Sequence, residues 1–215
     1  WVAARGGDGA TTVSGTMAVA AKAGIAVFAT GGIGGVHRGF IDGHDVSADI
    51  DALGRYPVLV VAAGVKSLLD LPRTLEALES RGVPVVGFCT DELPSFYARD
   101  SGLRLGLRVD SAAAAAAAFA LQRTLVPGVG ALLCNPPSVA TALARVDVDG
   151  WVAAALADAD AAHIRGAAIT PFVLARLLER SGGRTLVANR ALALANATLA
   201  AEVAVALASA GRRAP

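Results

Sequence analysis

Lys66 is the residue whose type and setting point most directly to chemistry. It lies in the segment 62–67 (AAGVKS), where an apolar run turns toward a leucine-rich stretch, and the only other lysine is Lys22. An amine beside an apolar strand end and a helix N-terminus should have a lowered pKa, as a Schiff-base nucleophile requires. The alternative is a lysine that only extends its charge into solvent. The position of Lys66 favours the functional interpretation.

A glycine-rich segment, residues 30–39 (TGGIGGVHRG), follows a short apolar run. Glycines let backbone N–H groups approach an anion closely, and His37 and Arg38 add charge or hydrogen-bond donors. The glycine spacing matches neither the dinucleotide-binding fingerprint nor a Walker loop. This segment alone supports a phosphate subsite and a structural turn equally.

Two carboxylates, Asp45 and Asp49, lie four residues apart with Ser47 between them. Their oxygens suit a hard cation. Helix capping by Asp45 or Ser47 is the alternative, and the pattern alone favours it. His44 is expected to be an exposed loop histidine rather than a ligand. No Ser-His-Asp arrangement and no Cys/His spacing typical of zinc is recognisable in the sequence.

The elements that would position these residues alternate between strands and helices. Short apolar runs bounded by Gly or Pro predict strands over 24–30, 57–63, 83–89 and 131–134. Apolar spacing, Ala content and capping residues predict helices over 15–23, 67–81, 111–121, 151–162, 170–181 and 185–210. Pro72 should lie in a first turn, Asp110 or Ser111 should cap the helix over 111–121, and Thr170 should cap the helix that it opens. The order predicts a layered α/β/α domain with a central sheet and a helical C-terminal part, in which ligands collect at the carboxyl ends of the strands.

Length and composition narrow the classes of protein. The 215 residues are 54% hydrophobic with a net charge of +1, and no linker divides them, so 1–215 is expected to form one domain. The charge gives no reason to expect a nucleic-acid polymer as partner. No unbroken apolar run of about 20 residues and no secretory signal is recognised. Cys89 and Cys134 form no motif and are expected to be free, buried thiols of a cytoplasmic protein.

Five segments spread along nearly the whole sequence match one enzyme family. They are residues 9–17 (GATTVSGTM), 28–40 (FATGGIGGVHRGF), 45–50 (DVSADI), 60–97 and 169–183. The blocks TGGIGGVHRG and AGVKSLLDLPRTLE are the specific ones. On these segments the chain resembles the pseudouridine-5′-phosphate glycosidases.

The resemblance implies a reaction, a metal and a set of site residues. The reaction is the reversible conversion of pseudouridine 5′-phosphate and water to uracil and ribose 5-phosphate, through opening of the ribose ring and a covalent lysine adduct. Lys66 matches the family's nucleophile, and Asp45 matches its ligand for Mn²⁺, one ion per subunit. The matched substrate-binding positions are Val13, Ser47, Ala48, Asp49 and Asn189, and His37 is added from the glycine loop. A homotrimer acting on a small nucleotide or sugar phosphate is implied, with no membrane partner.

The sequence also departs from the family pattern. The family has an N-terminal portion with a proton-donating glutamate and a substrate-contacting lysine. We expect residues 1–215 to lack it, since the sequence begins at Trp1. Ala195-Asn196 keeps one residue of a paired-Asn signature, and Gly166-Ala167-Ala168 stands where the family has Gly-Lys-Glu. Two alternatives therefore stay open: a catalytically degenerate sugar-phosphate-binding or assembly module, and another Schiff-base sugar-phosphate lyase such as an aldolase.

Overall fold

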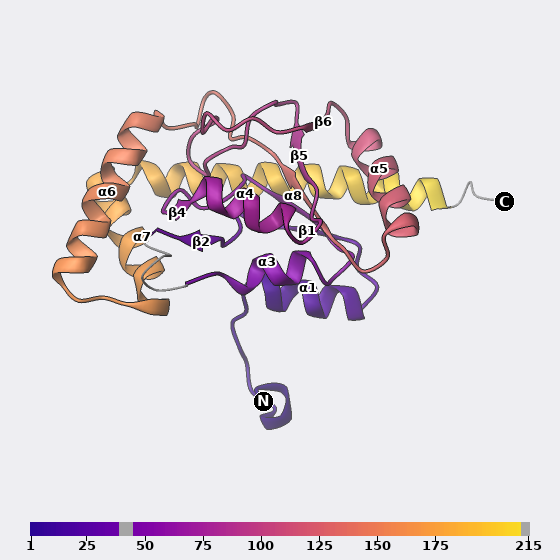
Figure 1. Ribbon diagram of the computed structural model, residues 1–215, viewed down its shortest axis with the longest axis horizontal. Helices are drawn as coiled ribbons and strands as arrows, with labels where there is room; N and C mark the ends of the chain where they lie inside the picture. Colours follow the sequence, from indigo (N-terminus) through magenta and orange to yellow (C-terminus); the bar gives the residue numbers. More distant parts are fainter. Residues whose placement is uncertain (39–44, 212–215) are drawn as a thin grey trace.

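Five parallel strands form the central sheet of the computed structural model, which describes residues 1–38 and 45–211 (Figure 1). Their spatial order is β1 (Val27–Ala29), β3 (Leu59–Ala62), β7 (Ala131–Cys134), β5 (Val85–Phe88) and β6 (Leu107–Val109). Every neighbouring pair is parallel. A separate antiparallel pair is formed by β2 (Val36–His37) and β4 (Leu69–Asp70).

The central strands are apolar throughout because both faces of the sheet are buried. In β3, Leu59 and Val61 belong to one core cluster, whereas Val60 and Ala62 belong to the other. This alternation is expected when successive side chains point to opposite faces of a parallel sheet covered by helices on both sides.

Helices cover both faces of the sheet, which confirms the predicted layered fold and its helical C-terminal part. One core cluster joins the sheet to α5 (Ala112–Leu125) and to the C-terminal half of α8 (Arg184–Gly211). The other core cluster involves α1 (Val13–Lys22), α3 (Ala48–Leu53), α4 (Leu71–Glu79), α6 (Arg145–Ala161) and α7 (Ile169–Arg180). The short 3₁₀ turns are η1 (Ala3–Arg5) and η2 (Gly166–Ala168).

The predicted helix over 67–81 is wrong in its first turn. Residues 69–70 form β4, because Leu69 and Asp70 pair with His37 and Val36 of β2. Asp70 then caps α4 through a hydrogen bond from the Arg73 N–H, and the proline lies in the first turn as predicted. The pairing with a distant segment decides the conformation of these residues, although their leucine spacing is helical.

Two further boundaries differ from expectation. Thr170 does not cap α7: it is the second residue of that helix, whose N-cap is Ala168 with no capping side-chain hydrogen bond. Helix α6 begins at Arg145, six residues before the expected start at Trp151. The cap of α5 is as predicted, since Ser111 Oγ accepts the Ala114 N–H at 3.1 Å.

Among the described residues, α8 is the one helix long and apolar enough to cross a bilayer, judged by length and composition alone. An 18-residue window within Arg184–Ser209 has a mean hydropathy of 1.8, and 28% of that window is buried. The sequence alone predicts no such span. One such helix is weak evidence, since the core helix of a folded domain passes the same test. The buried face of α8 packs on the sheet, while Leu194 and Val205 point outward with exposed fractions of 71% and 68%.

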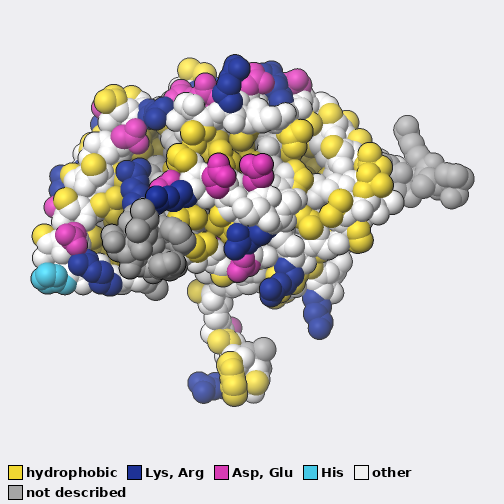
Figure 2. All heavy atoms as spheres, viewed as in Figure 1, with side chains coloured by type: hydrophobic (Ala, Val, Ile, Leu, Met, Phe, Trp, Pro, Cys, Tyr) yellow, Lys and Arg dark blue, Asp and Glu magenta, His cyan; other side chains and the backbone are white. Residues whose placement is uncertain are grey.

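Apolar side chains are also exposed near α5, at the right of the face shown in Figure 2. Leu121 and Leu125 are 59% and 69% exposed, and they border a groove of about 390 Å³ between α5 and the strands β3, β7, β5 and β6. The groove is lined almost entirely by apolar side chains and shares no lining residue with the pocket described below.

Candidate functional site

A pocket of about 740 Å³ opens at the carboxyl ends of β1 and β3. This is where ligands gather in open α/β sheets. Six of the expected site residues line it: Val13, His37, Ser47, Asp49, Lys66 and Asn189. The segments that carry them are far apart in sequence, so the fold itself brings them together.

Lys66 lies half-buried in the turn that leads from β3 to β4. Its N–H donates to the Ile33 carbonyl at 3.2 Å, and its own carbonyl accepts the Leu69 N–H at 3.0 Å. The first bond ties the lysine backbone to the glycine-rich loop, and the second ties it to β4. The expected neighbouring helix N-terminus is wrong, because β4 separates Lys66 from the start of α4.

The glycines of the 31–35 segment are required by close packing. A Cβ on Gly32 would lie 2.4 Å from the Phe96 ring, and a Cβ on Gly34 would lie 2.2 Å from Ser47 Oγ. Backbone amides of this loop are also bound within the protein, since Ile33, Gly34 and Val36 donate to the Gly64 carbonyl, Asp49 and Thr74 respectively. The structural interpretation of the glycines therefore outweighs the anion-binding one for this part of the loop.

Asp49 is the buried carboxylate of the pocket, with 4% of its surface exposed. Its Oδ1 accepts the Ser14 N–H at 2.9 Å, and its Oδ2 accepts the Gly34 N–H at 2.8 Å. Two backbone donors stabilise a buried negative charge. Asp49 therefore joins the first turn of α1 to the glycine-rich loop within the pocket wall.

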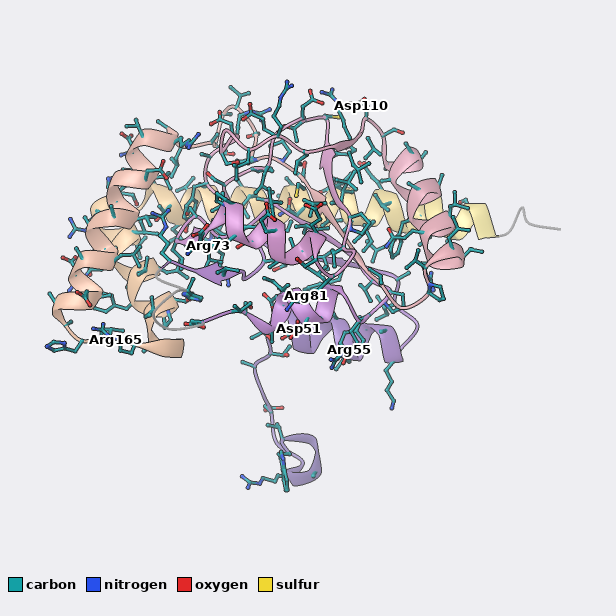
Figure 3. The ribbon with its side chains drawn as sticks, in the orientation of Figure 1. Asp51, Arg55, Arg73, Arg81, Asp110 and Arg165 are labelled. Carbon is teal, nitrogen blue, oxygen red and sulfur yellow. The ribbon has the colours of Figure 1, made fainter. Side chains whose placement is uncertain are left out.

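Ser47 caps α3, because its Oγ accepts the Asp49 N–H at 3.2 Å. The capping interpretation of this segment is thus confirmed for Ser47 and not for Asp45. Ala48, the first residue of α3, is exposed and is not part of the pocket lining. An ion pair between Asp51 and Arg81 joins α3 to the end of α4, with 2.6 Å between Oδ1 and Nε (Figure 3).

Asp45 lies beside the pocket next to His37. Its carbonyl accepts the His37 N–H at 3.0 Å, and its Oδ2 is 3.9 Å from His37 Nδ1. The part of the chain that the structure describes has no group of three or more His, Cys, Asp or Glu side chains placed to hold a metal. His44 lies outside the described residues. The donors present fit a hard cation bound by one carboxylate, with water or substrate oxygens as its other ligands.

Other segments contribute residues that were not expected in the pocket. Thr12 and Thr16 line the pocket from the start of α1, Thr170 lines it from α7, and Phe96 and Tyr97 line it from the loop after β5. The two aromatic rings meet edge to face, with centroids 4.6 Å apart. Burial raises the pKa of the Tyr97 hydroxyl to about 12, so this side chain stays neutral at physiological pH. A short polar loop segment gives no periodic signal that would have identified these residues.

The two cysteines differ from each other. Cys134 is fully buried, and burial raises the pKa of its thiol to about 12. Cys89 is exposed, so the expectation that both thiols are buried is wrong for Cys89. Both are free, as predicted.

Comparison with known proteins gives consistent matches along nearly the whole chain. A family model described as "Indigoidine synthase A like protein" matches residues 1–206. The pseudouridine-5′-phosphate glycosidase of Herpetosiphon aurantiacus is 56% identical over 207 residues, which are 96% of this chain and 68% of that protein. The enzyme of the same name from Methylobacterium nodulans is 54% identical over 95% of this chain and 60% of its own length. The chain thus spans about two thirds of the length of these relatives.

Two solved structures are similar throughout. The prealnumycin C-glycosynthase AlnA, crystallised in complex with ribulose 5-phosphate, superimposes with a TM-score of 0.93 at 38% identity, covering 98% of this chain and 70% of that one. An indigoidine synthase A-like protein from Thermotoga maritima gives a TM-score of 0.84 at 34% identity, covering 92% of this chain and 64% of that one.

Proposed function

Because the chain belongs to the pseudouridine-5′-phosphate glycosidase family, we propose that its pocket cleaves the C–C glycosidic bond of pseudouridine 5′-phosphate, reversibly, to uracil and ribose 5-phosphate. The observation that carries the proposal is the placement of Lys66 in the same pocket as Asp49, His37 and Asn189. A structural neighbour named as a C-glycosynthase, in complex with ribulose 5-phosphate, supports a phosphorylated sugar as ligand.

We propose Lys66 as the nucleophile. Departure of uracil breaks a carbon–carbon bond and leaves positive charge at C1′ of the sugar, so C1′ needs an electron donor, since there is no glycosidic oxygen to protonate. The Lys66 amine supplies that donor: it attacks C1′, the C1′–O4′ bond breaks, and O4′ takes up a proton as the C4′ hydroxyl. When the C1′–C5 bond then breaks, C5 of uracil takes a proton and the lysine nitrogen forms an imine with C1′, which one water hydrolyses to ribose 5-phosphate and free lysine.

The other pocket residues fit roles in binding. The turn that holds Lys66 is bonded to the glycine-rich loop. The Lys66 backbone, from which the amine reaches the substrate, is therefore held in a fixed position. Asp49 fixes the first turn of α1, where Val13 lies in the pocket wall. The side chains of Ser47, His37 and Asn189 supply hydrogen-bonding groups for hydroxyl, phosphate or base oxygens.

Mn²⁺ belongs to the proposal as a bound metal, with Asp45 as its carboxylate ligand and His37 beside it. A bound divalent ion would supply positive charge next to the substrate phosphate or hydroxyl oxygens. The homotrimer and the cytoplasmic location also stay predictions. The exposed apolar side chains of α5 and α8 are consistent with burial in an assembly. Light scattering on purified protein would measure the number of subunits.

The deciding experiment is borohydride trapping with ribose 5-phosphate, followed by peptide mass spectrometry. We expect the reduced adduct on Lys66 and none on Lys22, which is exposed at the end of α1. Lys66→Arg should abolish both the adduct and uracil release, whereas Lys22→Arg should retain both. Full activity without an adduct on Lys66 would overturn the mechanism.

An assay of product identity separates this function from the related ones. Uracil release from pseudouridine 5′-phosphate supports the glycosidase. A Lys66 adduct without uracil release would favour another sugar-phosphate lyase, and sugar-phosphate binding without an adduct would favour a binding module. Because the chain spans about two thirds of its relatives, the assay should use the whole natural protein as well as residues 1–215.

A further inference from the structure

Asn196 is a polar side chain with 0% of its surface exposed, in the middle of α8. Its Nδ2 donates to the Thr30 carbonyl at 2.8 Å and, more weakly, to the Gly31 carbonyl at 3.4 Å. Its Oδ1 accepts a hydrogen bond from Asn135 Nδ2 at 3.0 Å. A buried amide is costly unless it is bonded in this way, so the side chain has one stable orientation.

The partners of Asn196 lie at the carboxyl ends of two strands, and one of them contacts a third. Thr30 and Gly31 follow β1 and line the pocket. Asn135 follows β7, and its N–H donates to the Ala62 carbonyl at the end of β3, at 2.8 Å. The two amide side chains, which we call the Asn135–Asn196 pair, therefore connect α8 to the carboxyl ends of the strands, where the pocket lies.

The same helix carries Asn189 into the pocket. Asn189 precedes Asn196 by seven residues, which is about two helical turns, so both lie on nearly the same side of α8. Asn189 Oδ1 is 3.4 Å from the point where a Cβ on Gly31 would lie. A shift of α8 along its axis or about it would change this approach directly.

We propose that Asn196 is a positioning residue of the site: with Asn135 it sets the location of α8 against Thr30 and Gly31, and thereby that of Asn189 in the pocket. The inference rests on the proposed function for its effect on turnover. The contacts themselves do not depend on that function.

The first test compares Asn196→Ala with Val203→Ala. Val203 is fully buried on the same helix but packs in the core cluster on the far side of the sheet and does not line the pocket. We expect kcat/KM for uracil release to fall about 10- to 100-fold in Asn196→Ala, as for small misplacements of pocket groups. At a temperature where both variants are folded, Val203→Ala should change kcat/KM less than threefold. Equal losses in the two variants would show a merely structural role and overturn the proposal.

A double-mutant cycle tests whether Asn196 acts through Asn189. Asn189→Ala and the double variant Asn189→Ala/Asn196→Ala should have kcat/KM values within about threefold of each other, because coupled residues are not additive. If the fold-loss of kcat/KM in the double variant equals the product of the two single losses, the two residues act independently, and the proposal that Asn196 acts through Asn189 is overturned. If Asn196→Ala does not fold, Asn135→Ala removes the partner of Oδ1 and takes its place in both comparisons.

Amide hydrogen exchange distinguishes failure of this inference from failure of the proposed function. The Ala63 N–H donates to the Gly31 carbonyl at 2.9 Å. Its exchange rate therefore reports on the residues after β1 that Asn196 holds. Its exchange should accelerate at least tenfold in Asn196→Ala and stay within threefold in Val203→Ala. An absence of uracil release from the natural protein would reject the function alone, whereas unchanged Ala63 exchange would reject the positioning role alone.

Discussion

Asp49 holds Gly34 by a 2.8 Å hydrogen bond from the glycine N–H to Oδ2, inside the pocket that contains Lys66. The contact leaves no room for a side chain at position 34, because a Cβ there would lie 2.9 Å from that same oxygen. Since Lys66 is bonded to the neighbouring Ile33, the carboxylate and the nucleophile are linked through one short stretch of backbone. The geometry of this stretch should therefore control the position of the Lys66 amine and its reaction with the substrate.

The first prediction concerns Asp49→Asn. An amide has one acceptor oxygen, so its NH₂ group would face a backbone N–H of either Ser14 or Gly34. We expect a loss of about 1–3 kcal/mol in the free energy of unfolding, from the buried donor left unpaired, and a loss of at least tenfold in kcat/KM. Urea denaturation and a uracil-release assay measure the two effects.

The matched control for that change is Asp51→Asn. Asp51 lies two residues on, with its side chain 63% exposed and paired with Arg81. Exposed ion pairs contribute little, so the free energy of unfolding should change by less than about 1 kcal/mol. Equal effects of the two substitutions would contradict the role assigned to the buried carboxylate.

The second prediction concerns Gly34→Ala. The added Cβ would lie 2.2 Å from Ser47 Oγ and 2.6 Å from Ser47 Cβ, so either the loop or the start of α3 must move. We expect destabilisation of about 1–3 kcal/mol, as for overpacking of a dense interior, and reduced trapping of Lys66 by borohydride. Gly106→Ala is the control, because a Cβ there meets nothing within 4 Å. Retention of full trapping in Gly34→Ala would show that the loop adapts without moving the lysine.

The part of the fold that follows from local sequence is four of the five strands of the central sheet, namely β1, β3, β5 and β7, and the helices with clear signals. The run 131–134 reads as a buried strand because it is apolar and bounded by Gly130 and Asn135. The poly-Ala stretch after Ser111 forms α5 with the predicted cap. In these segments the local preference and the tertiary environment agree, which is the condition for a correct prediction.

The missed elements lack such local signals. Strand β6 contains Leu107 and Arg108, both exposed, because it lies at the edge of the sheet. No apolar run marks it. For the short helix α3 the sequence indicates only a possible N-cap, because six residues are too few to show a helical pattern of apolar side chains.

For the site, residue type pointed to Lys66, and Val13 and Asn189 were expected only from the family resemblance; neither source predicted the contacts. The spacing of Asp45 and Asp49 suits a cation site, although the pattern alone favours helix capping. The fold instead directs Asp49 to two backbone N–H groups and leaves Asp45 near His37. These partners are up to 35 residues away in sequence, so no local pattern could have identified them.

The third prediction concerns the proposed metal. Asp45→Asn should raise the Kd for Mn²⁺ at least tenfold, because a neutral amide replaces the carboxylate ligand. Electron paramagnetic resonance of free Mn²⁺ measures the Kd without an activity assay. Asp51→Asn should leave the Kd unchanged. Unchanged binding in Asp45→Asn would place the metal elsewhere, and no Mn²⁺ binding by the natural protein would remove the metal from the proposal.

The last prediction concerns stability at alkaline pH. Burial raises the pKa of Cys134 from 9.0 to about 12 and that of Tyr97 from 10.0 to about 12. The unfolded chain therefore loses these protons at lower pH than the folded protein does. Titration of these groups should leave the free energy of unfolding unchanged below about pH 9. The free energy should then fall as the pH rises toward 12, by at most about 1.4 kcal/mol per pH unit for each group. Cys134→Ala should make the decline between pH 9 and pH 11 shallower, whereas Cys89→Ala, at the exposed thiol, should leave its slope unchanged. Urea denaturation at each pH measures the slope, and an identical slope in the natural protein and in Cys134→Ala would contradict the assignment to the buried thiol.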